Sequence, residues 1–218
     1  MILITGSSGR IGGTLAHGLN TEYQLSRFDL KTGSDVLDVP VLFAASRGVS
    51  AIIHCALDEQ AENWKSPKIE PKHLQMASNI YEAALANQIP RVIIASSVHA
   101  DNFYHWQGPV LMDPDAHPHP KNPYGITKVA TELLGSYYAE TKGFEVVCIR
   151  FGGVNRENRP PTDTFGRGHW LSHEDLLELF RTILRSMPVS HRHTVMYAVS
   201  STQHSVHDTV NPWGWKPR

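Results

Sequence analysis

The chain has 218 residues, of which 41% are hydrophobic and 19% are charged, and its 20 basic and 21 acidic side chains leave a net charge of −1. This balance gives no long-range attraction to nucleic acid or to an acidic membrane surface, so we expect neither as a partner. No apolar run approaches the roughly 18 residues of a membrane span, and the first residues lack the pattern of a signal peptide, so a cytoplasmic location is the expectation.

Short apolar runs alternate with amphipathic stretches along the chain. The runs that we expect to form strands are residues 1–5, 23–30, 51–57, 91–97, 144–151 and 193–200. The stretches that we expect to form helices are residues 11–19, 40–48, 72–88, 124–142 and 172–185. Residues 101–123 and 156–169 are expected to be loops.

Apolar strands without alternation are typical of a parallel sheet that helices cover on both faces. Strands that alternate with helices predict right-handed βαβ units. We therefore predict an α/β fold with a Rossmann-like, doubly wound parallel sheet. Residues 1–150 would form the core that carries the catalytic residues. Residues 151–218 would form a small substrate-binding lobe packed on this core, within a single domain overall.

Neither the cysteines nor the histidines have the spacing of metal ligands. Cys55 and Cys148 lie in apolar runs and are expected to be buried free thiols. The 13 histidines include those of the stretches HPHP and HRH, which have no carboxylate or cysteine partner at ligand spacing. We expect solvated histidines in these stretches and no metal site.

The first strand ends in the glycine-rich stretch ITGSSGRIGG. Gly6, Gly9 and Gly12 directly follow a strand and open a helix, where glycines allow a tight turn, the approach of a phosphate and close helix packing. Free N–H groups and the helix dipole face an anion at such a position. The stretch therefore predicts that the core binds a dinucleotide.

Asp29 ends the second expected strand, where an acidic side chain accepts hydrogen bonds from the ribose of NAD and repels a 2′-phosphate. Arg10, Arg27 and Lys31 lie close by in the sequence and leave NADP open as the alternative. We favour NAD as the cofactor of the core.

Tyr124 and Lys128 are four residues apart at the start of an expected helix, so they share one face. An ammonium stabilises a nearby phenolate, and such a pair can exchange a proton with an alcohol or a carbonyl. The spacing alone occurs by chance in many helices. Ser96 and Ser97, however, end the fourth strand at the carboxyl edge of the same sheet, where a serine can hydrogen-bond the same substrate oxygen.

The stretches TGSSGRIG, ASS and YGITK together resemble the short-chain dehydrogenase/reductase superfamily, in its extended branch, the NAD-dependent epimerase/dehydratase family. The stretches ASSVHADNFY, RFGGVN, HWLSHEDL and GWKP are similar to the uronate dehydrogenases, which oxidise C1 of a hexuronic acid with NAD to an aldarolactone. The resemblance implies an oxidoreductase of carbohydrate metabolism, an NAD-dependent sugar dehydrogenase of the uronate type. A sugar epimerase and a non-catalytic NAD(P)-binding sensor are the alternatives. Extended-branch relatives often dimerise, so the resemblance also implies a homo-oligomer as a candidate state.

The resemblance implies a role for each matching residue. Tyr124 would take the hydroxyl proton, Lys128 would stabilise the phenolate and hold the nicotinamide ribose, and Ser97 would orient the reacting oxygen, with Ser96 as the alternative. The residues that would contact the cofactor are Gly6, Ser8, Gly9, Arg10, Ile11, Gly12, Asp29, Asp38, Ala56, Leu57, Tyr124 and Lys128. The residues that would contact the sugar are Ser97, His99, Tyr124 and Arg167, with Arg156 and Arg159 as other candidates for a carboxylate clamp.

The chain departs from the uronate dehydrogenase pattern at three positions. Val98 and His73 stand where that group has asparagines, and Gly153 stands where it has a pocket serine. A neutral aldose or another acidic sugar therefore stays open as the substrate. Trp64 is a further candidate to line a sugar site, against simple packing.

Overall fold

The computed structural model describes residues 1–57, 65–103, 106 and 110–218; the candidate Trp64 lies outside these residues. Its elements in chain order are β1 (Ile2–Thr5), α1 (Arg10–Gly18), β2 (Leu25–Phe28), η1 (Leu30–Thr32), α2 (Val39–Ala45), β3 (Ala51–His54), α3 (Pro71–Ala86), β4 (Arg91–Ser97), η3 (Val98–Ala100), α4 (Pro123–Lys142), β5 (Glu145–Phe151), α5 (Thr164–Gly168), α6 (His173–Arg185) and β6 (His193–Ala198).

In the described part of the chain, six parallel strands form one sheet in the order β2-β1-β3-β4-β5-β6. The chain leaves β1 toward β2 and then crosses back to β3, so the direction of winding reverses between β1 and β3. Open α/β sheets bind ligands at such a switch point, outside the carboxyl ends of the strands. The predicted doubly wound parallel sheet is thereby confirmed.

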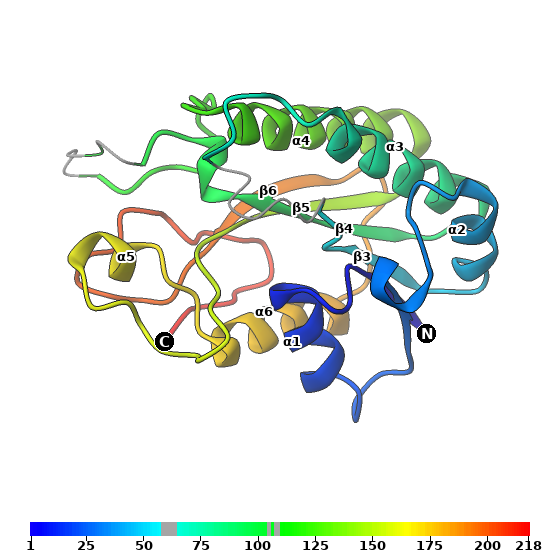
Figure 1. Ribbon diagram of the computed structural model, residues 1–218, viewed down its shortest axis with the longest axis horizontal. Helices are drawn as coiled ribbons and strands as arrows, with labels where there is room; N and C mark the ends of the chain where they lie inside the picture. The colour runs from blue at the N-terminus through cyan, green and yellow to red at the C-terminus, as the bar shows by residue number, and fades with distance from the viewer. Residues whose placement is uncertain (58–64, 104–105, 107–109) are drawn as a thin grey trace.

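Helices cover both faces of the sheet, with α1 and α6 on one side and α3 and α4 on the other (Figure 1). Successive residues of β1 point to opposite faces, so Ile2 and Ile4 pack with α1 and α6, whereas Leu3 packs with α2 and α3. Because both faces are covered, the strands are apolar without alternation, as the sequence indicates. Cys148 is buried in β5 and Cys55 is half-buried after β3, and both are free thiols.

The predicted boundary at residue 150 cuts through this sheet, because β6 pairs with β5 and α6 packs into the core. The remaining segments, 152–172 and 199–218, lie beyond the carboxyl ends of β5 and β6 (Figure 1). Within the predicted loop 156–169 the structure has the short helix α5, so that part of the loop prediction was wrong. Asp163 caps α5 by accepting a hydrogen bond from the Gly166 N–H at 2.7 Å. Among the described residues, no helix has the length and apolarity that crossing a bilayer requires.

A buried chain of polar groups ties α4 to three strands at one level of the sheet. Ser96 of β4 lies beside Arg150 of β5, which lies beside Tyr197 of β6. Glu132 of α4 accepts a hydrogen bond from Ser96 Oγ and two from the Arg150 guanidinium, at 3.0 and 2.8 Å. Arg150 also donates to the Tyr197 hydroxyl at 3.2 Å, and that hydroxyl donates to Asp101 at 3.2 Å.

We expect the substitution Glu132→Ala to lower the free energy of unfolding by about 3 kcal/mol, because it leaves the buried Arg150 guanidinium without its carboxylate. Urea denaturation followed by circular dichroism measures the loss. The control is Glu22→Ala, which removes more exposed ion pairs with Arg181 (2.7 Å) and Arg185 (3.4 Å) and should cost about 1 kcal/mol or less. Equal losses in the two variants would contradict the structural role given to Glu132.

Candidate functional site

The loop between β1 and α1 lies at the switch point of the sheet. Gly6 has a φ of +68°, and a Cβ at this residue would lie 2.5 Å from the Ala56 backbone nitrogen, so the turn against the end of β3 requires glycine. Gly9 is the N-cap residue of α1 and has no side chain to cap it. The first N–H groups of α1 can therefore bind an anion, as a phosphate-binding loop requires.

Asp29 lies beside this loop and is only 8% exposed. Its Oδ2 accepts a hydrogen bond from the Ser8 N–H at 2.7 Å, and its Oδ1 accepts one from the Lys31 N–H at 2.9 Å. Each carboxylate oxygen can accept a further bond, such as one from a ribose hydroxyl. Arg27, which the sequence left as a possible partner of a 2′-phosphate, donates instead to the Ala16 carbonyl of α1 at 2.7 Å.

The other residues that the sequence predicts at the cofactor differ in their positions and contacts. Arg10 and Ile11 open α1, and Ala56 backs the turn at Gly6. Leu57 follows Ala56 and is 36% exposed. Asp38 caps α2 by accepting a hydrogen bond from the Val41 N–H at 3.2 Å, so its carboxylate already has a structural role.

Tyr124 lies in the first turn of α4, one turn before Lys128. The Lys128 side chain is buried, and its Nζ donates a hydrogen bond to the Ala95 carbonyl of β4 at 2.7 Å. The same Nζ is 5.5 Å from the centre of the Tyr124 ring. Burial, with Lys128 and His73 as lesser causes, lowers the pKa of the neighbouring His54 to about 3. The ammonium of Lys128 therefore lies between the phenol and the end of β4, beside a neutral imidazole.

His99 also lies beside Tyr124, at 5.8 Å between ring centres. The two segments meet because residue 125 is glycine, since a Cβ there would lie 2.0 Å from the His99 carbonyl oxygen. Asn122 caps α4 by accepting a hydrogen bond from the Gly125 N–H at 2.7 Å, and its Nδ2 lies 3.1 Å from His99 Nδ1. Burial lowers the pKa of His99 to about 4, so the ring is neutral near pH 7 and accepts this bond at Nδ1.

The structure separates the two serines at the end of β4. The Ser96 hydroxyl donates to Glu132 inside the protein. The Ser97 hydroxyl accepts a hydrogen bond from the His99 N–H at 3.2 Å and can still donate its own proton. The Ser97 hydroxyl, and not that of Ser96, can therefore donate a hydrogen bond to a ligand oxygen.

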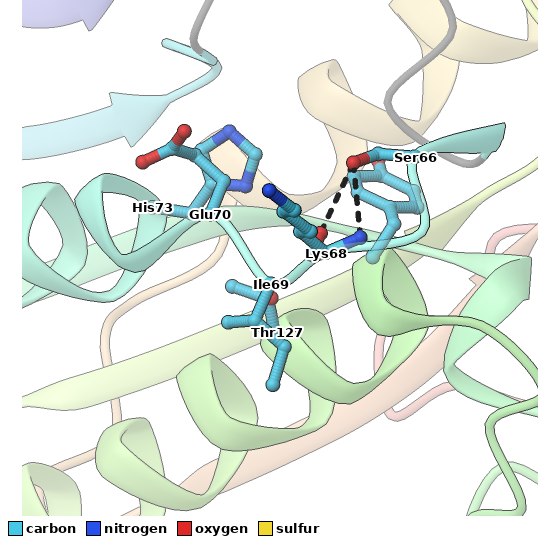
Figure 2. A pocket seen from close by; sticks show the side chains of 7 residues that line it. Ser66, Lys68, Ile69, Glu70, His73 and Thr127 are labelled. Atoms are coloured by element: carbon cyan, nitrogen blue, oxygen red, sulfur yellow. Dashed lines mark hydrogen bonds between the residues drawn. The ribbon is translucent and has the colours of Figure 1, made fainter.

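A cavity of about 200 Å³ opens beside Tyr124 between the start of α3 and the start of α4. The residues that line it are Ser66, Lys68, Ile69, Glu70, His73, Tyr124 and Thr127. Figure 2 shows the lining residues, with Ser66 and Lys68 joined by hydrogen bonds of 3.1 and 3.3 Å. Arg167, the predicted carboxylate clamp, does not line this cavity; it is exposed on α5, and its Nε donates to the Pro161 carbonyl at 3.0 Å.

A group of buried rings lies next to His99, at residues where the sequence indicates no site. Phe103 is 5.2 Å from His99 and 4.3 Å from His169, and His207 is 5.2 Å from His169 and 4.6 Å from Tyr197, all between ring centres. His207 is 2% exposed, and its ring nitrogens have no hydrogen-bond partner among the described residues. Burial is the main cause that lowers the pKa of His207 to about 3.

Sequence reasoning missed two residues that position the site, Asn122 and Glu132. Asn122 precedes Pro123, and an N-cap residue followed by proline is a recognised helix-start signal that could have identified it. Glu132 follows Lys128 by four residues and therefore lies on the helix face of Tyr124 and Lys128. That spacing would have suggested a contact with the same strand end.

Residues 2–164 match the model of the NAD dependent epimerase/dehydratase family. The chain is 26% identical to an L-arabinose 1-dehydrogenase (NAD(P)(+)) of Haloferax volcanii, over 100% of this chain and 96% of that protein. It is 29% identical to a uronate dehydrogenase of Pseudomonas syringae pv. tomato, over 93% of this chain and 75% of that protein. The solved uronate dehydrogenase of Agrobacterium tumefaciens has the same fold, with a TM-score of 0.82, 24% identity, and coverage of 100% of this chain and 84% of that one.

The buried His207 predicts acid sensitivity of the fold. In the unfolded chain His207 takes up a proton as the pH falls below the ordinary histidine pKa of 6.5, whereas in the folded chain it stays neutral down to about pH 3. The folded state is therefore destabilised as the pH falls through this window. At pH 5 this loss amounts to about 2 kcal/mol.

The substitution His207→Phe should reduce the loss of unfolding free energy between pH 7 and pH 5 by the part that His207 causes. Urea denaturation at both pH values measures this change. The exposed His117, replaced by glutamine, is the control and should leave the pH dependence unchanged. A His207→Phe variant with the pH dependence of the wild type would show that His207 is protonated in the folded state.

Proposed function

The chain belongs to the NAD dependent epimerase/dehydratase family, and from that premise we propose that it is an NAD-dependent sugar dehydrogenase. The substrate is a hexuronate or a related aldose, and the C1 hydroxyl is oxidised to give a lactone. The observation that carries the proposal is the grouping of Tyr124, Lys128, Ser97 and His99 at the carboxyl edge of a sheet whose switch point holds a phosphate loop. The match to a uronate dehydrogenase over 93% of the chain supports the substrate class.

The residues at the switch point fit NAD. The turn at Gly6 and the uncapped start of α1 provide backbone donors for a diphosphate. The carboxylate of Asp29, held beside Ser8, suits a ribose with free hydroxyls and disfavours a 2′-phosphate. When bound, NAD supplies the acceptor for the hydride that leaves C1.

The side chains around Tyr124 handle the proton. The Tyr124 oxygen accepts the proton of the C1 hydroxyl, and the Lys128 ammonium stabilises the phenolate that does so. Ser97 donates its free hydrogen to the same sugar oxygen and holds it in place. The neutral His99, whose Nδ1 is engaged by Asn122, carries its proton on Nε2 and can donate it to a neighbouring sugar oxygen.

An acidic sugar needs a cation for its carboxylate. Among the described residues that line the cavity beside Tyr124, Lys68 carries such a charge. We therefore assign the carboxylate to Lys68, with the sequence-predicted Arg167 as the alternative. A compact ammonium binds a carboxylate as a point charge and without the paired hydrogen bonds of a guanidinium.

The proposal is tested by NADH absorbance with purified protein, NAD and a panel of sugars. Glucuronate and galacturonate should give NADH, and glucose, galactose and arabinose should give it more slowly. Turnover of neutral sugars alone would keep the dehydrogenase and overturn the acidic substrate. A protein that binds NAD but forms no NADH with any sugar would contradict the dehydrogenase itself.

Replacing Tyr124 with phenylalanine should lower kcat by about 100-fold or more, because it removes the group that accepts the proton. The dissociation constant for NAD should stay close to that of the wild type, since the phosphate loop and Asp29 are untouched. The exposed Tyr137 on the same helix, also replaced with phenylalanine, serves as the control. A Tyr124→Phe variant with wild-type kcat would exclude Tyr124 as the base.

A further inference from the structure

A second cavity, of about 220 Å³, lies between the phosphate loop and the segment that follows β5. One wall comes from residues 8–10 and Thr14, at the start of α1. The other wall comes from Asn155, Arg156 and His173, which lie about 150 positions further along the chain. The cavity therefore joins the expected diphosphate site to the part of the chain that lies beyond the carboxyl edge of the sheet.

The turn that carries Arg156 is closed by its own hydrogen bonds. Asn155 Nδ2 donates to the Arg159 carbonyl at 2.6 Å, and the Arg159 N–H donates back to Asn155 Oδ1 at 3.1 Å. Asn158, inside the turn, has a φ of +50°, a left-handed conformation that asparagine tolerates better than most residues. The backbone on both sides of Arg156 is thereby held in one conformation.

The same turn is attached to the start of α6. Asn158 Oδ1 accepts a hydrogen bond from the His173 N–H at 2.8 Å, and Asn158 Nδ2 donates to both carboxylate oxygens of Glu174 at 3.0 and 2.9 Å. His173 Nε2 donates to the Asn155 carbonyl at 2.8 Å. Because α6 packs on α1 in the core, this attachment fixes the wall that holds Arg156 relative to the phosphate loop.

The charges around the cavity favour an anion. Arg10 and Arg156 line it from opposite walls, and both are exposed. The positive end of the α1 dipole lies at the same place, since its N-cap residue Gly9 lines the cavity and its first turn has no acidic side chain. The carboxylate of Glu174, in the first turn of α6, is engaged by Asn158.

We propose that Arg156 binds the diphosphate of NAD from the side opposite the phosphate loop. This inference rests on the proposed function, because it takes NAD as the ligand. The phosphate loop supplies backbone donors to one side of the diphosphate, and the guanidinium supplies a charged, forked donor to the other, a geometry that suits phosphate oxygens. The cofactor then bridges α1 and the turn at residues 155–159.

Isothermal titration of the sugar-free protein tests the proposal with NAD, ADP-ribose and adenosine as probes. Arg156→Ala should raise the dissociation constants for NAD and ADP-ribose by about tenfold, the loss of a charge-assisted hydrogen bond, and should leave adenosine binding unchanged. Arg156→Lys keeps the charge without the fork and should fall between the wild type and the alanine variant. Arg159→Ala is the matched control, because Arg159 is exposed in the same turn and does not line the cavity.

An Arg156→Ala variant that binds ADP-ribose as the wild type does would overturn the inference and leave the proposed function intact. So would an equal loss in Arg159→Ala, which would point to a general effect of surface charge, or an equal loss for adenosine, which would point to a disturbed fold. A wild-type protein that binds none of the three probes would instead overturn the proposed function, and the inference with it.

Discussion

The geometry of the site depends on the hydrogen bonds that the buried carboxylate of Glu132 accepts from Ser96 and Arg150. Lys128 and Glu132 lie one helical turn apart on α4, and they hydrogen-bond Ala95 and Ser96, which are consecutive residues of β4. Two hydrogen bonds at successive turns fix both the position of a helix along its axis and its rotation about that axis relative to the strand. Tyr124, one turn earlier, is thereby placed where β4 ends. The Arg150 guanidinium neutralises the carboxylate and carries the same constraint into β5.

Burial keeps most of the titratable rings around this contact uncharged. His54, His99 and His207 all have a pKa well below the usual value for histidine, and desolvation is the main cause in each case. His54, the imidazole whose pKa Lys128 helps to lower, is therefore neutral beside the Lys128 ammonium.

Features that are local in the sequence could be predicted from it. The glycine spacing, the tyrosine–lysine pair and the alternation of strands and helices each follow from short-range periodicity or sterics. The contact that ties up the Ser96 hydroxyl could not be predicted, because its partner Glu132 lies 36 residues further along the chain on α4. The short helix Thr164–Gly168 rests on an aspartate cap and has no periodic pattern to reveal it. The burial of His207 depends on a distant segment, since the chain on either side of it hydrogen-bonds Met112.

The double engagement of Asp29 has a consequence for how this protein could change its cofactor in evolution or by design. Since a carboxylate at this position disfavours a 2′-phosphate, the simplest change toward NADP is to replace it with a small or neutral residue. Here the same carboxylate also accepts a hydrogen bond from the Ser8 N–H and so supports the glycine-rich loop that we propose binds the phosphates. Removing it would open space for a 2′-phosphate and, in the same step, leave a donor of the loop without its acceptor. In the proposed role of Asp29 at the ribose, cofactor choice and cofactor affinity are coupled through one side chain, and we expect a switch of preference to need a second substitution that restores an acceptor for Ser8.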